Sequence, residues 1–432
     1  MSDGSNTADH AALSGSELLR LAESALHAGK SARAFELLTR AASVGVEPNL
    51  LHRLAAAYAL AGRYQGRQAD VLTWIEGVIA ANTDIVQRAA LLRARVAVCR
   101  QLDLERVLEL AEEALAAAEK EGDETAYASV LASAAFAGYR RGDSRIASEY
   151  AERAAARTFT SEEAHYDCVR AQMFCASCVG DLEAALNYAT KARAMAREMN
   201  HLADVANESN NLAEQYLELG CPAEARACAE TAIALARRSG HASVDYFGQV
   251  MRAVATAEIG HIDEAIEQFD RLERSLDTNR IFAVDAATLH SYWLLERGAA
   301  GDAPHAREIA ESGVALARAS GVANRFTALY SNIARARARE GEHEQARVAL
   351  EEARRAAATA EPRAQSLLAL SVAEVMPVTE AKRKVALTNA RARILRSAQR
   401  REDPRAFCNN VRLNRRLLEL SGGVPDDLPV AE

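Results

Sequence analysis

Small and apolar residues recur along most of the chain at fixed distances after a glycine. The glycine is followed by Ala or Val five residues on, and by small or apolar residues nine and twelve residues on, as in Gly220, Ala225, Ala229 and Ala232. Intervals of three and four residues return to the same face of an α-helix. Each set therefore predicts a helix that begins shortly after the glycine and buries one face of small side chains.

The set recurs with a nearly constant period. It begins at Gly29, Leu102, Gly142, Gly180, Gly220, Gly260, Gly301 and Gly341, and from Leu102 onward the steps are 40, 38, 40, 40, 41 and 40 residues. A second helical stretch precedes each of these positions, and a second break follows near Gly122, Ser161, Asn200, Gly240, Asn279, Gly321 and Pro362. Each unit is therefore predicted to be a helical hairpin, and stacking buries the apolar faces that one hairpin leaves exposed.

Two joints depart from this pattern. Gly62 has no Ala at the expected distance after it, and Gly298 to Gly301 reads as a three-residue insertion at a hinge. We predict ten hairpins, the first led by the capping signal Ser14 to Glu17 and the last interrupted at Met376-Pro377. A further amphipathic helix over 404–421 is expected to cap the stack.

The pattern resembles tetratricopeptide repeats, in a variety with longer helices. The match is carried by Asn211-Leu212-Ala213 with Tyr216, Gly220, Ala225 and Ala232, and by Asn332-Ile333-Ala334 with Gly341 and Ala346. The resemblance covers about residues 17 to 403. It implies an all-α solenoid, a right-handed superhelix of about ten hairpins, that binds a protein or peptide.

The closing segment from Ile394 to Leu420 resembles the end of tetratricopeptide regions fused to serine/threonine kinases in bacteria. The sequence itself carries no glycine-rich phosphate loop, no His-Arg-Asp loop and no Asp-Phe-Gly. The resemblance therefore implies an adaptor or sensor in bacterial signalling rather than a kinase.

Composition agrees with a helical, cytoplasmic protein. The 432 residues include only 8 Pro and 22 Gly, and the 7 Cys are too few and too irregular for a disulfide scaffold. The chain has neither a signal-peptide pattern at its start nor an apolar run long enough to span a membrane, so no membrane partner is expected. We expect a disordered tail over 1–14, the solenoid over 15–403, the capping helix over 404–421 and a flexible tail over 422–432.

No pattern of catalytic or metal-binding residues emerges. Gly29-Lys30-Ser31 lacks the first glycine of a phosphate-binding loop, because Ser24 stands in its place. The cysteines Cys168, Cys175 and Cys178 fall on one predicted helix and are interpreted as buried thiols rather than metal ligands. His201, His241, His261 and His343 fall at turns, where solvated side chains are expected. We therefore predict no enzyme activity, no cofactor and no metal.

The first helix of each hairpin is expected to line the concave surface of the superhelix. Residues ten and six positions before each hinge then form two parallel stripes, which contain aromatic, Arg and amide side chains suited to anchoring a peptide. The candidates are Phe136, Arg170, Phe174, Asn210, Glu214, Tyr292 and Arg335. The alternative is that several of them only pack between neighbouring helices.

The segment from Glu380 to Arg416 is strongly basic. It holds twelve Lys and Arg against three acids, a charge of +9 that leaves −17 for the rest of a chain of net charge −8. The candidate basic patch is Lys382, Lys384, Arg383, Arg391, Arg400, Arg401, Arg412, Arg415 and Arg416. With Phe407 as its one aromatic, the segment favours a solvated cap face or an acidic protein partner over nucleic acid.

A second hypothesis is a regulator in which a small molecule or short peptide fills the groove and changes the superhelical pitch, and a third is nucleic-acid binding through the basic C-terminal segment. The irregular joints at Gly62 and Gly298 are where such a stack would flex.

Overall fold

The computed structural model describes residues 13–81, 87–273, 280–357, 362–377, 379–426 and 428, and in these ranges the chain is all-α and contains no β-strand. The helices are α1 Gly15–His27, α2 Ser31–Val44, α3 Leu51–Gln65, α4 Gln68–Ala81, α5 Arg88–Cys99, α6 Leu104–Glu121, α7 Glu124–Arg141, α8 Ser144–Ala155, α9 Glu162–Val179, α10 Leu182–Glu198, α11 Leu202–Leu219, α12 Pro222–Ser239, α13 Ala242–Glu258, α14 Ile262–Glu273, α15 Arg280–Arg297, α16 Asp302–Ser320, α17 Phe326–Arg339, α18 His343–Ala356, α19 Pro362–Val375, α20 Ala381–Ala398, α21 Pro404–Asn409 and α22 Arg412–Leu420. A short 3₁₀ turn, η1 Pro48–Leu50, precedes α3.

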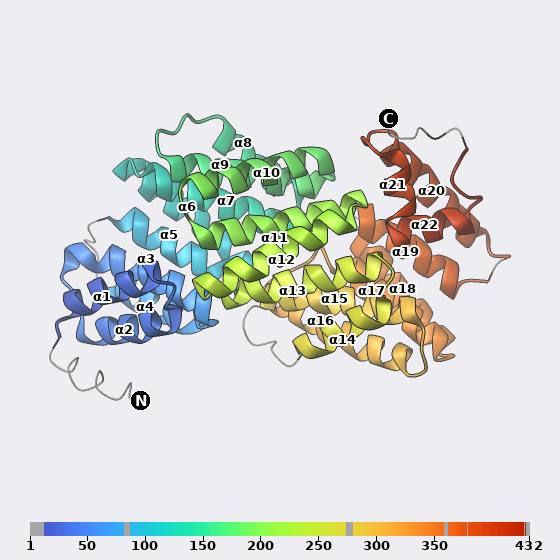
Figure 1. Ribbon diagram of the computed structural model, residues 1–432, viewed down its shortest axis with the longest axis horizontal. Helices are drawn as coiled ribbons and strands as arrows, with labels where there is room; N and C mark the ends of the chain where they lie inside the picture. Colours follow the sequence, from blue (N-terminus) through green and yellow to red (C-terminus); the bar gives the residue numbers. More distant parts are fainter. Residues whose placement is uncertain are drawn as a thin grey trace.

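Helices α1 to α20 pair in chain order as the ten predicted hairpins. The two helices of a hairpin pack together, and first helices of neighbouring hairpins also touch, as α7 touches α9 and α17 touches α19. The molecule is thus an α-solenoid of tetratricopeptide-like hairpins. Figure 1 shows α1 to α4 at one end and α20 to α22 at the other, with α11 and α12 crossing the middle.

The small residues after each hinge form the buried face that the period predicts. Ala225, Ala229 and Ala232 of α12 are fully buried. The first helix of a hairpin also uses small residues, because a Cβ on Gly138 of α7 would lie 2.6 Å from the backbone nitrogen of Ala147 on α8. Small side chains on both helices therefore set the short distance between them.

Most predicted hinges have the expected local structure. Gly142, Gly180 and Gly220 end their helices in the left-handed conformation that favours glycine. The following helices α8 and α10 are capped at their N-termini by Asp143 and Asp181, whose side chains accept hydrogen bonds from backbone N–H groups. The capping box from Ser14 to Glu17 is confirmed, whereas Asn279 lies outside the described residues.

The hinge of the second hairpin is Gly66, and its placement at Gly62 was wrong. Helix α3 continues through Gly62 and ends at Gly66, which has a φ of 68°. Counted from Gly66, the buried Val71 and Ile75 of α4 occupy the five- and nine-residue positions. At Gly62 a Cβ would lie 2.5 Å from Cγ2 of Val71, so this glycine permits close packing and does not turn the chain.

The predicted capping helix over 404–421 is two short helices, α21 and α22. Val411 between them is extended, and Nδ2 of Asn414 donates to the carbonyl oxygen of Phe407 at 3.0 Å. Nδ2 of Asn410 donates to the carbonyl of the hinge Gly220 at 3.0 Å. A continuous helix would lose the contact between this break and the end of α11.

The predicted tails are only partly described. Residues 1–12 of the expected N-terminal tail, and 427 and 429–432 of the expected C-terminal tail, lie outside the described residues. Gly423 and Leu428 of the latter contact the cap, because their carbonyl oxygens accept from Arg391 at 3.5 Å and from Arg405 at 3.1 Å.

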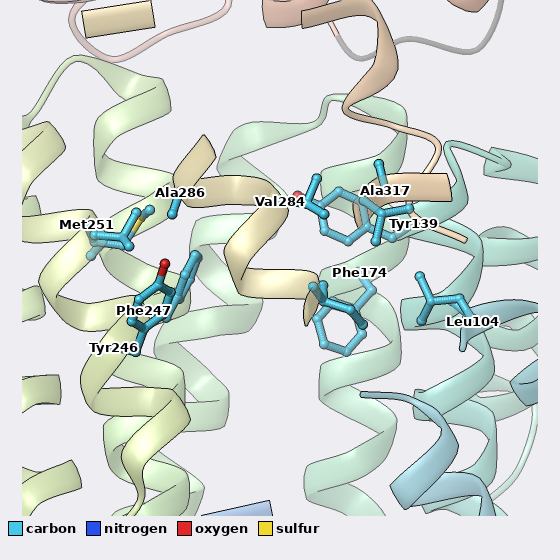
Figure 2. Packing of buried hydrophobic residues seen from close by; sticks show 14 of the residues in the cluster. Leu104, Tyr139, Phe174, Tyr246, Phe247, Met251, Val284, Ala286 and Ala317 are labelled. Atoms are coloured by element: carbon cyan, nitrogen blue, oxygen red, sulfur yellow. The ribbon is translucent and has the colours of Figure 1, made fainter. Parts of the chain in front are cut away.

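Successive turns of the superhelix touch each other. Oγ of Ser31 donates to the backbone carbonyl of Gly240, 209 residues later, at 3.1 Å. The backbone N–H of Asn324 donates to the backbone carbonyl of Arg140 at 3.1 Å. With a period of forty residues, about five hairpins complete one turn. Figure 2 draws part of the shared apolar cluster, in which Tyr139 of α7, Val284 of α15 and Ala317 of α16 belong together.

Candidate functional site: the lumen of the superhelix

The concave side of the superhelix holds a central pocket of about 740 Å³, open in part to solvent. As predicted, first helices of the hairpins line it: α11 contributes Leu217, α13 contributes Met251 and α15 contributes Leu289 and Tyr292. Its apolar walls come mostly from these side chains. Its polar groups are Thr288 and a set of carboxylates and arginines that pair with one another.

Two further pockets share residues with the central one. The N-terminal pocket shares Phe247 with it and is lined also by arginine and amide side chains from α3 to α11. The C-terminal pocket shares Glu214, Glu218 and Arg363, and extends to the capping helices at Phe407. The three pockets follow one another along the inside of the superhelix.

Charges that line the central pocket also join the turns. Asp285 of α15, almost fully buried, accepts from Arg140 of α7 at 3.0 Å and from Arg325 at 2.7 Å. Arg325 also lies 3.4 Å from Glu214 of α11. Burial opposes ionisation of Asp285, but the two arginines outweigh it and hold the pKa of Asp285 below its usual value. The pair stays ionised where α7 meets α15.

The seven candidate residues of the two predicted stripes fall into two groups, those that line a pocket and those that do not. Phe136, Arg170 and Phe174 line the N-terminal pocket, and Glu214 and Tyr292 line the central pocket.

Asn210 and Arg335 line none of the three pockets and are almost completely buried. Asn210 donates to the carbonyl of Val244 at 2.9 Å, and Arg335 pairs with Glu296 and Glu374 at 2.6 and 2.9 Å. Partner contact by any stripe residue stays a prediction.

Two further positions on the same helix face were not predicted. Residues nine and thirteen before the hinge also reach the pockets: Asn211 and Asn207 before Gly220, Met251 and Phe247 before Gly260, Leu289 and Asp285 before Gly298. The helical period alone contained this signal. Arg325 and Arg363 carry no such signal, because they come from the starts of α17 and α19 and reach the pockets through the superhelical turn.

The predicted basic patch is not one surface. Arg412 and Arg416 both pair with the buried Glu296 at 2.9 Å, and Arg416 also pairs with Glu374 at 2.6 Å. Nε of Arg383 donates to the carbonyl of Ala373 at 2.8 Å.

Two other members of the patch are also engaged. Arg391 contacts Gly423, and Arg401 lies over the ring of Phe407. The exposed members are Lys382, Lys384, Arg400 and Arg415. An acidic partner for them stays a prediction.

The remaining candidate residues from the sequence are cysteines and histidines. All seven cysteines are free, and Cys168, Cys175 and Cys178 are half-buried rather than fully buried. Among the described residues no group of three or more His, Cys, Asp or Glu is arranged to hold a metal ion, and no helix is long and apolar enough to cross a membrane. His241 was expected in solvent but is buried, with its ring centroid 4.4 Å from that of Tyr64.

Comparison with solved structures identifies the fold. A Rap protein complexed with Competence and Sporulation Factor matches with a TM-score of 0.50 and 16% identity, over 80% of this chain and 99% of that chain. The APC/C hetero-tetramer Cut9-Hcn1 matches with a TM-score of 0.51 and 13% identity, over 94% and 76% respectively. No protein-family model and no curated protein matches the sequence. This chain has a tetratricopeptide-like fold.

Proposed function

We propose that this chain is a non-catalytic adaptor or sensor in bacterial signalling that binds a peptide, or an extended segment of a protein, in its lumen. The observation that carries the proposal is the central pocket, where Met251, Leu289 and Leu217 form an apolar wall next to Thr288 and Glu214. Pockets of this kind bind through apolar area and use a few polar groups to fix orientation. Asn207 and Asn211 of the N-terminal pocket add carboxamides, which suit the polar backbone of a peptide.

The comparison supports ligand binding by a protein of this fold. The Rap protein, which shares this fold, is complexed with Competence and Sporulation Factor. The two sequences are 16% identical, so the ligand of this chain has to be inferred from the residues that line its own lumen.

The test is retention of a synthetic pool of random heptapeptides by the immobilised full-length chain, read by mass spectrometry. Leu289→Arg places a long charged side chain in the central pocket and is expected to reduce retention about tenfold or more, since it buries a charge where apolar contact is needed. Val348→Arg is the matched control, because Val348 is 66% exposed on the second helix α18. Equal retention by both variants, or none by the unchanged chain, would contradict the proposal.

A second function is favoured by the charges of the central pocket. Glu214, Asp285 and Arg325 line the pocket, and Asp285 is also paired with Arg140 of α7. A ligand that engages these groups alters the contact between two superhelical turns, so binding is coupled to pitch. Small-angle scattering is expected to show that the radius of gyration of the chain changes when a retained peptide is added. An unchanged radius would mean that the chain binds the peptide without a change of pitch.

A further inference from the structure

The N-terminal pocket brings together arginines from separate elements. It encloses about 580 Å³ and is lined by Arg63 near the end of α3, Arg100 directly after α5 and Arg170 of α9. Amide groups of Gln101 and Asn211 lie in the same lining. Among the described residues no carboxylate lines this pocket, although acidic residues line the central one.

Two of the three arginines form no ion pair with a carboxylate among the described residues. Arg170 is paired with Asp167 at 3.0 Å and with Glu208 at 3.1 Å. Across the described part of the chain, no carboxylate lies within 4.0 Å of Arg63 or Arg100, and both side chains are half-buried. The Arg100 guanidinium lies 5.5 Å from the ring centroid of Phe136, a contact that leaves its N–H donors available.

The surroundings of these two arginines are electropositive. Burial, together with the nearby Arg170 and Arg63, lowers the pKa of Arg100 to about 9, and Asp167 opposes this shift without cancelling it. His241, which lines the same pocket, has a pKa held well below its usual value by burial, by Arg63 and by Arg100. Half-buried positive charges that lack a carboxylate at ion-pair distance are costly, so the site favours an anion from outside the chain.

We propose that Arg63 and Arg100 form a binding site for a carboxylate of the peptide ligand. This inference rests on the proposed function and names the chemistry that the N-terminal pocket recognises. A guanidinium presents paired N–H donors that match the two oxygens of a carboxylate. Oε1 of Gln101 accepts from Gln68 and Nδ2 of Asn211 donates to Glu208, so Nε2 of Gln101 and Oδ1 of Asn211 are the atoms that can bond the adjacent peptide group. Phe136 and Phe174 provide an aromatic wall for the neighbouring side chain.

The experiment uses three pools of N-acetylated heptapeptides built from uncharged residues. The first has a free C-terminal carboxylate, the second is amidated at the C-terminus, and the third is amidated and carries one internal Asp or Glu. The unchanged full-length chain is expected to retain the first pool about tenfold more than the second, as a charge-assisted hydrogen bond warrants. Preference for the third pool over the first would assign the carboxylate to a side chain of the ligand.

Arg63→Gln and Arg100→Gln are expected to abolish the preference for carboxylate, so that each variant retains the first and second pools equally. Neither variant leaves a carboxylate without its partner, so both are expected to fold, with thermal midpoints at or above that of the unchanged chain. Arg145→Gln is the matched control, because Arg145 is 76% exposed and lies outside the pocket. Equal retention of all pools by the unchanged chain would overturn the carboxylate site and leave peptide binding intact, whereas no retention of any pool would overturn both.

Discussion

Glu296 is a buried carboxylate held ionised by three arginines from two helices, α17 and α22. Its side chain is fully buried and lies 2.6 Å from Arg335 and 2.9 Å from both Arg412 and Arg416. Burial alone would raise the pKa of Glu296, but the arginines outweigh it and hold the pKa at about 2, against an ordinary value of 4.5. Because the folded pKa is depressed, the interaction stabilises the fold above pH 4.5 and is lost as the pH falls toward 2.

We expect Glu296→Gln to lower the free energy of unfolding at pH 7 by about 3 kcal/mol, since a shift of this size corresponds to that energy. The loss of stability on acidification from pH 4.5 should be smaller in the variant by a similar amount. Urea unfolding at several pH values measures both effects. Glu230→Gln is the control, because Glu230 forms an exposed pair with Arg226. Parallel acid profiles for Glu296→Gln and the unchanged chain would contradict the assignment.

At the scale of the element, a glycine inside a first helix sets how closely a hairpin packs. Gly138 of α7 lies four residues before its hinge, as Gly62 does in α3 relative to Gly66. A methyl group at Gly138 would meet the backbone of α8 at Ala147, which cannot rotate away as a side chain can. The hairpin α7–α8 would have to open to admit it.

We expect Gly138→Ala to destabilise the chain by about 1–3 kcal/mol through overpacking, although alanine is the better helix former. Gly77→Ala in α4 is the matched control, since nothing lies within 4 Å of the added methyl. That change should stabilise the chain by about 0.5–1 kcal/mol. Thermal unfolding distinguishes the two, and stabilisation of equal size at both positions would show that the hairpin has room at Gly138.

The sequence pattern predicted the helices more accurately than it located the irregular joints between them. The residues that mark Gly142 and Gly180 as hinges are close to them in the sequence, because the left-handed turn and the buried alanines lie within one hairpin. At the second hairpin two glycines, Gly62 and Gly66, compete, and the apolar residues that decide for Gly66 are Val and Ile rather than Ala. The break between α21 and α22 depends on a hydrogen bond from Asn410 to the distant Gly220, which no local pattern encodes.

At the scale of the whole molecule, contacts between turns hold the pitch of the superhelix. Asp285 is paired with Arg140, 145 residues earlier, and with Arg325. Asp285→Asn leaves both arginines without this carboxylate, and removal of one partner from a buried pair costs about 3–5 kcal/mol. We expect lower stability together with a larger radius of gyration in small-angle scattering.

A control variant distinguishes loss of pitch from general destabilisation. Arg226→Gln breaks a pair of exposed side chains within α12 and is expected to change neither stability nor radius measurably. If Asp285→Asn lowers stability with an unchanged radius, the ion pair stabilises the stack but does not set its pitch.

By itself the sequence determined the helical hairpin, its number of repeats and the helix that faces the lumen, because each depends on residues within one turn of helix or one hairpin. It therefore also placed Phe136, Phe174, Glu214 and Tyr292 on the concave side. Only the tertiary structure decided which charges meet across the turns, that Arg335 is buried within an ion-pair cluster and that His241 is shielded by Tyr64. The pitch is the sum of small rotations between successive hairpins, so contacts between residues some 200 positions apart, such as Ser31 and Gly240, follow from the whole stack and from no local pattern.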